Sequence, residues 1–132
     1  MTLHEHIDAV FAVANECVTG GEFRMHINGN CMSPAIKHGD EATVRRSTFY
    51  FPGDVIVFRT NRSFVAHRVL GWIPSRRGIG LLTKGDHCER HDGVIDRSRV
   101  LGRLDAHVAP ADRLRALFAF MAVTLRRLLR RT

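Results

Sequence analysis

Four side chains in the middle of the chain have the chemistry of nucleophilic catalysis: Cys31, His67, Asp86 and Asp92. Cys31 stands in the segment GNCMSP (29–34), a glycine-proline turn that could expose the thiol at the end of a strand, with the cysteine N–H available as an oxyanion donor. His67 stands in an alternating apolar segment, and a histidine can accept a thiol proton near neutral pH because its ordinary pKa is about 6.5. Plainer interpretations also exist: a small buried cysteine and a hydrogen-bonded structural histidine.

A carboxylate beside His67 would fix the tautomer of the imidazole and stabilise the imidazolium that forms after proton transfer. The segment TKGDHCERHD (83–92) offers two carboxylates, Asp86 and Asp92. We expect Asp86 to lie beside His67, and we rank Asp92 second. The alternative is a solvated turn carboxylate, because aspartate is common in glycine-containing turns.

The same segment carries groups that zinc binds. His87, Cys88 and His91, together with His67 or Asp92, have the imidazole, thiolate and carboxylate chemistry of zinc ligands. Their spacing is not that of a standard zinc finger, and one turn rarely supplies three ligands in tetrahedral geometry. We therefore predict no metal site and no cofactor, with a zinc content far below stoichiometric in the purified protein.

The spacing of apolar residues changes along the chain, and it predicts which helices and strands position these four residues. Residues 1–20 predict a helix, with a capping box at Thr2 and Glu5 and a glycine pair at its end. Residues 22–108 predict short strands separated by glycines, and residues 111–131 predict a basic amphipathic helix. We expect a mainly β fold, in which a coiled, barrel-like core carries an N-terminal and a C-terminal helix, as a single domain of residues 1–132.

The net charge of +7 is concentrated near the C-terminus. Residues 103–132 hold seven arginines and two aspartates, which account for +5 of it. Because the rest of the chain is nearly balanced, we expect no nucleic-acid partner. The apolar face of the C-terminal helix has two interpretations: packing in the domain or in a dimer, or an interfacial membrane helix whose arginines meet anionic lipid. This face consists of Leu114, Leu117, Phe118, Met121, Leu125, Leu128 and Leu129.

The cysteine count and the lengths of the apolar segments indicate the cellular compartment. Three cysteines, at an odd count and without regular spacing, favour a reducing environment. The N-terminus does not have the pattern of a secretory signal, and no apolar stretch reaches the roughly 18–20 residues that span a bilayer. We expect a cytoplasmic protein, with peripheral membrane contact open through the C-terminal helix.

Four motifs in order resemble the type I signal peptidases and the wider LexA-like peptidase superfamily. They are GNCMSPAIKHGD (29–40), GDVIVF (53–58), HRVLG (67–71) and TKGDHCERHD (83–92), and the resemblance covers residues 23–103. The histidine that precedes Arg68 resembles the one found in the archaeal and endoplasmic-reticulum branch of the signal peptidases, where a histidine serves in place of the lysine base. The resemblance implies a mainly β, barrel-like core, with Cys31 as the nucleophile, His67 as the general base, and Asp86 and Asp92 as supporting acids.

The sequence departs from that family in two ways that bear on function. Cys31 stands in place of the nucleophilic serine, and an imidazole can hold a neighbouring thiol as thiolate. No segment is similar to the N-terminal membrane anchor of signal peptidases, so we expect a soluble substrate.

We therefore expect a cysteine-type endopeptidase that processes a peptide or protein precursor. Two alternatives stay open. One is a catalytically inactive relative that binds peptides. The other is a LexA-like self-cleaving regulator, which is disfavoured because the His67 region has no base lysine and the chain shows no DNA-binding helix-turn-helix.

Overall fold

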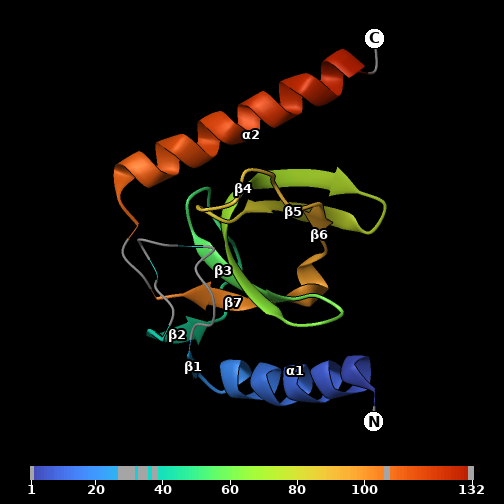
Figure 1. The fold of residues 1–132 in the computed structure, drawn as a ribbon, viewed down its shortest axis with the longest axis vertical. Coiled ribbons are helices and arrows are strands. Elements are labelled where there is room, and N and C mark those ends of the chain that lie inside the picture. The colour runs from blue at the N-terminus through green and yellow to red at the C-terminus, as the bar shows by residue number, and fades with distance from the viewer. Residues whose placement is uncertain (1, 27–31, 33–35, 37–38, 106–107, 131–132) are drawn as a thin grey trace.

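The computed structural model describes residues 2–26, 32, 36, 39–105 and 108–130. Within these residues, seven strands form one curled antiparallel sheet with a helix on either side (Figure 1). The strands are β1 (Phe23–His26), β2 (Glu41–Arg45), β3 (Val55–Arg59), β4 (Phe64–Ser75), β5 (Gly78–Lys84), β6 (Val94–Ile95) and β7 (Val100–Leu104). Their order in the sheet is β1-β2-β7-β3-β4-β5-β6, and a short 3₁₀ helix (Arg97–Arg99) precedes β7. The prediction of a mainly β fold with terminal helices is confirmed.

Helix α1 (Leu3–Thr19) begins with the predicted capping box. The Glu5 N–H donates to the Thr2 hydroxyl, and the Thr2 N–H donates to the Glu5 carboxylate. The helix ends before Gly20, which keeps a right-handed conformation, and Gly21 takes the positive φ, at 147°. The buried residues of α1 are Ile7, Ala14 and Val18, and the helix packs against β1 and β7.

Strand β3 is apolar at consecutive positions because both of its faces are buried. Val55 and Val57 face one core cluster, with Val44 and Leu101 among its members. The alternate residues Ile56 and Phe58 face a second cluster on the other side of the sheet, with Val69 and Leu81. The run of apolar residues at 55–58 therefore marks a central strand, between β7 and β4.

Helix α2 (Pro110–Arg130) packs over β4 through small and aromatic residues. Ala116 is buried with Leu70 and Leu82, and Ala119, Phe120 and Val123 pack around them. The predicted apolar stripe of large residues does not make this contact. Those side chains are exposed, so packing within the domain was the wrong interpretation for them. No helix in the described ranges is both long and apolar enough to cross a membrane.

The close approach of α2 to the sheet depends on Gly71 in β4. A Cβ atom built on Gly71 would lie 2.5 Å from Cδ2 of the Phe120 ring, which is closer than carbon atoms can approach. Glycine therefore lets the aromatic ring lie directly on the strand backbone.

We predict that Gly71→Ala destabilises the fold by about 1–3 kcal/mol, because the ring and its helix must shift to make room for the methyl group. Chemical denaturation measures this free energy of unfolding. Gly93→Ala is the matched control: it has no positive φ, and nothing lies within 4 Å of its added Cβ. We expect the control to be neutral or slightly stabilising. Equal stability of the two variants would contradict the packing described here.

Candidate active site

His67 lies on the interior strand β4, between β3 and β5. It pairs with Ile56 across the β3–β4 ladder, and its ring meets the edge of the Phe58 ring with the centroids 5.9 Å apart. Alternation along the strand places it on the same face as Val65 and Val69, which belong to the second core cluster. The residue is only 7% exposed, so protein atoms rather than solvent set the orientation of its imidazole.

The carboxylate beside His67 is that of Asp92. His67 Nδ1 lies 2.6 Å from Asp92 Oδ2. The buried Thr83 hydroxyl donates to the same oxygen, also at 2.6 Å, and the Asp92 N–H donates to the Thr83 carbonyl at 2.7 Å. Thr83 thus holds Asp92 by its backbone and by its side chain, and Asp92 in turn holds the histidine ring.

Burial acts to raise the pKa of the Asp92 carboxyl. The hydrogen bonds from His67 and Thr83, together with the charges of His67 and His91, outweigh burial and hold this pKa below its ordinary value. The carboxylate is therefore ionised at neutral pH and accepts a hydrogen bond from the Nδ1–H of His67. In the neutral ring, Nε2 is then the basic nitrogen that can take up a proton.

Asp86 does not lie where the sequence analysis expected it. Its two oxygens accept from Nε and Nη2 of Arg68, at 2.8 and 2.7 Å, so the expectation that Asp86 accompanies His67 was wrong. Successive side chains on a strand point to opposite faces, and Arg68 therefore takes the carboxylate on its own side of β4. The planar guanidinium matches both carboxylate oxygens, which makes this pair geometrically specific. The sequence offered one signal for this pair. Arg68 follows His67 within a predicted strand, and an arginine that is buried there needs a carboxylate partner, which the sequence analysis did not assign.

Met32 connects the turn at Asp86 to the segment that carries Cys31. The Asp86 N–H donates to Sδ of Met32 at 3.3 Å, and Met32 is 2% exposed in the first core cluster. The sequence analysis assigned no role to this methionine or to Thr83. Cys31 itself lies outside the described residues, and so does its predicted contact with His67.

Apart from His67 on β4, the residues considered as zinc ligands lie on the loop between β5 and β6. His91 Nδ1 donates to the Asp92 carbonyl at 2.5 Å, His87 is exposed and Cys88 is half-buried. Among the residues that the structure describes, no three histidine, cysteine or acidic side chains form a group that could hold a metal ion.

The contacts of Asp92 predict how stability depends on pH. A carboxyl whose folded pKa is depressed stabilises the fold above its unfolded value, here 3.8, and this stabilisation is lost as the pH falls through the folded value. We expect Asp92→Asn to cost about 1.5–3 kcal/mol near neutral pH, and the difference from wild type to shrink as the pH falls below 3.8 and through the lower folded pKa. Denaturation at a series of pH values measures it, with the exposed Asp105→Asn as control. A difference independent of pH would contradict the assigned contacts.

The comparisons with known proteins agree with this architecture. A family model described as Peptidase S24-like matches residues 1–103, a stretch that runs from α1 into β7 and includes all four residues singled out from the sequence. The comparison with curated proteins found no match, and neither did the comparison with solved structures. The family model covers more than three-quarters of the chain. The chain belongs to the Peptidase S24-like family.

Proposed function

We propose that this member of a peptidase family is a cysteine-type endopeptidase in which Cys31 is the nucleophile and His67 the general base. The observation that carries the proposal is the 2.6 Å contact between His67 Nδ1 and Asp92. It leaves Nε2 as the basic nitrogen of a ring whose orientation is held by packing and by a carboxylate. A base oriented in this way is what an adjacent thiol nucleophile requires.

The proposed reaction has two stages. His67 Nε2 takes the proton of the Cys31 thiol, and the sulfur forms a bond to the scissile carbonyl carbon while the carbonyl electron pair moves to oxygen. Backbone N–H groups, that of Cys31 among them, stabilise the oxyanion. The imidazolium protonates the leaving amine as the C–N bond breaks. His67 then deprotonates a water that attacks the thioester, which releases the acid product and restores the thiol.

Asp86 supports the proposal as a positioning residue. Its N–H contacts Met32, and its carboxylate binds Arg68. These two residues are the chain neighbours of Cys31 and His67, and consecutive Cα atoms are about 3.8 Å apart. We infer that Asp86 holds the backbone of the nucleophile near the strand of the base, while Asp92 orients the base itself.

A peptide or protein precursor is the proposed substrate class. Two other activities remain as outcomes of the experiment below: self-cleavage of the LexA type, and peptide binding without cleavage. The histidine base and its carboxylate favour catalysis over binding alone, because a folded peptide-binding module has no need of an oriented imidazole. A histidine rather than a lysine at this position disfavours self-cleavage of the LexA type.

We predict that Cys31→Ala abolishes cleavage of a synthetic peptide library, followed by mass spectrometry. Cys31→Ser should retain the fold and lose at least about 100-fold in rate, since a serine hydroxyl is far less acidic and the oxyanion donors would be misplaced for oxygen. The double variant Cys17→Ala/Cys88→Ala is the matched control, because it removes an exposed and a half-buried thiol elsewhere. It should keep full activity and full labelling by a thiol-directed peptide probe.

Each result of that experiment separates the candidate functions. Cleavage by folded Cys31→Ala would overturn the nucleophile. A Cys31-dependent shortening of the chain itself, at a rate independent of concentration, would assign self-cleavage instead. Peptide binding without any product in the wild type would assign a non-catalytic relative.

We also predict that Asp92→Asn lowers kcat by about 10²–10⁴-fold with little change in KM, because the imidazole loses its orientation and its imidazolium loses a counter-charge. Thr83→Val should lower kcat less, since it removes only the hydroxyl that holds Asp92. The exposed Asp105→Asn makes the same chemical change away from the site and should behave as wild type. A folded Asp92→Asn variant with full kcat would contradict the role given to Asp92.

A further inference from the structure

Helix α2 is apolar on two opposite sides. One side holds Ala116, Ala119, Phe120 and Val123 and packs on the sheet. The other side, here called the outer face, consists of Leu114, Leu117, Phe118, Met121, Leu125 and Leu128, which are 43–67% exposed. A monomeric protein rarely exposes so many large apolar side chains in one continuous stripe.

The outer face continues beyond the body of the protein. Val123 is the last residue of α2 that packs on the sheet, and every residue from 125 to 130 is exposed. Figure 1 shows the C-terminal end of α2 rising away from β4 and β5, on the side of the molecule opposite to α1. Packing against the fold therefore does not explain the leucines at 125, 128 and 129.

The charges of α2 have one sign and avoid the outer face. The helix carries five arginines and one aspartate, a net charge of +4. Arg115, Arg126 and Arg127 lie roughly 110–130° around the helix from the middle of the outer face, and Arg130 lies almost opposite to it. The carboxylate of Asp112 accepts from the Ala109 N–H, so it serves as a cap at the start of the helix.

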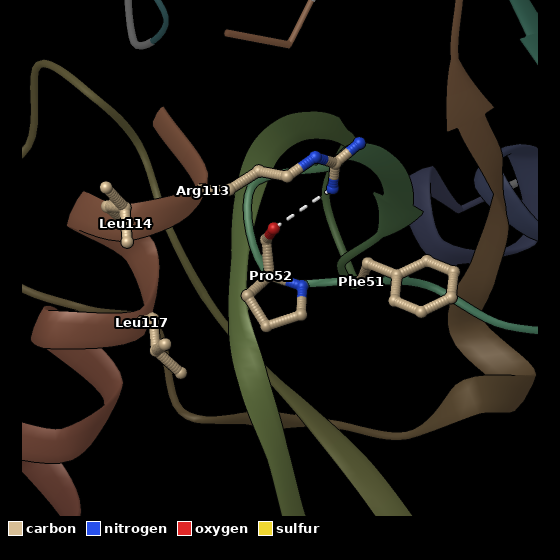
Figure 2. A pocket seen from close by; sticks show the side chains of 5 residues that line it. All are labelled: Phe51, Pro52, Arg113, Leu114 and Leu117. Carbon is tan, nitrogen blue, oxygen red and sulfur yellow. Dashed lines mark hydrogen bonds between the residues drawn. The ribbon is translucent and has the colours of Figure 1, made fainter. Parts of the chain in front are cut away.

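The apolar surface also widens at the N-terminal half of α2. Leu114 and Leu117 line a hollow together with Phe51 and Pro52 (Figure 2). Arg113 also lines this hollow. It lies above Pro52 in Figure 2, and its guanidinium donates to the Pro52 carbonyl at 3.1 Å. Phe51 is 52% exposed and continues into an aromatic group with Phe49.

A second copy of the chain fits this surface poorly. An antiparallel pair of α2 helices that met at their outer faces would bring the flanking Arg126 and Arg127 near the arginines at the start of the second helix, where the single acid is already engaged as a cap. A parallel pair would set like charges against each other, which disfavours association. An anionic bilayer meets both requirements, since it takes up the apolar side chains and neutralises the arginines.

We propose that α2 is an interfacial helix that binds the chain to anionic lipid. The helix lies in the plane of the membrane surface, with the outer face inserted among the acyl chains. The flanking arginines extend to the lipid phosphates. This proposal does not rest on the peptidase activity.

Flotation of the full chain with vesicles tests the proposal. Binding should be at least about tenfold stronger to an equimolar mixture of phosphatidylcholine and phosphatidylglycerol than to phosphatidylcholine alone, and it should weaken in high salt. Leu125→Gln/Leu128→Gln should weaken binding to the anionic vesicles about tenfold or more, because two side chains no longer insert. Arg126→Gln/Arg127→Gln should do so by a similar factor, because these two arginines flank the outer face.

Matched controls keep the test specific. Leu3→Gln/Val13→Gln changes two apolar residues of α1 that are 57% and 62% exposed, and Arg76→Gln/Arg77→Gln removes the same charge from the turn between β4 and β5. Both controls should bind as wild type, and all variants should keep the wild-type melting temperature. Absence of binding by the folded protein, or equal binding to both vesicles, would overturn the proposal. A dimer in sedimentation that Leu125→Gln/Leu128→Gln dissociates would assign the outer face to a second copy and overturn it also.

Discussion

The burial of one guanidinium organises the site. Arg68 is 6% exposed, and a buried cation is tolerated only when its donors are satisfied. Asp86 takes two of them, and the Gly53 carbonyl takes a third at 2.7 Å. The loop after β5 and the turn before β3 are therefore fixed to β4 at one residue. Through the contact of the Asp86 N–H with Met32, the same ion pair reaches the segment that holds the proposed nucleophile.

This ion pair also decides which carboxylate is left for His67. Arg68 and His67 are consecutive on a strand, so their side chains lie on opposite faces, and each face receives its own aspartate. Asp86 neutralises the arginine, while Asp92 reaches the histidine with the help of Thr83. Two aspartates of one loop thus do different work: one holds backbone segments together, and the other orients an imidazole. Removing the first leaves a buried charge, whereas removing the second leaves a ring without its partner.

The sequence predicts the features that depend on the periodicity of apolar residues and on the order of the motifs. It does not predict contacts that depend on the path of a loop. The capping box of α1 and the short strands between the two helices follow from local patterns, and both are present. The path of the loop from Gly85 to Asp92 has no period, so the choice between its two aspartates could not be read from spacing. The interpretation that the large apolar residues of α2 pack within the domain was wrong for another reason. The small residues of α2 and Gly71 of β4 let the helix pack closer to the sheet than the leucine stripe would. In the sequence, however, the stripe is the clearer helical pattern.

Helix α2 and the candidate site share one stretch of β4. Phe120 lies on Gly71, four residues beyond His67, and the guanidinium of Arg113 reaches Asp54 at 3.1 Å. The Asp54 carbonyl accepts from the Val69 N–H, and its neighbour Gly53 accepts from Arg68. The first half of α2 is thus joined to the residues around the base by the packing of Phe120 and by a part-buried ion pair, while residues 125–130 are exposed. A surface that bound the second half would therefore hold the whole sheet, and the site on it, in a fixed orientation relative to that surface.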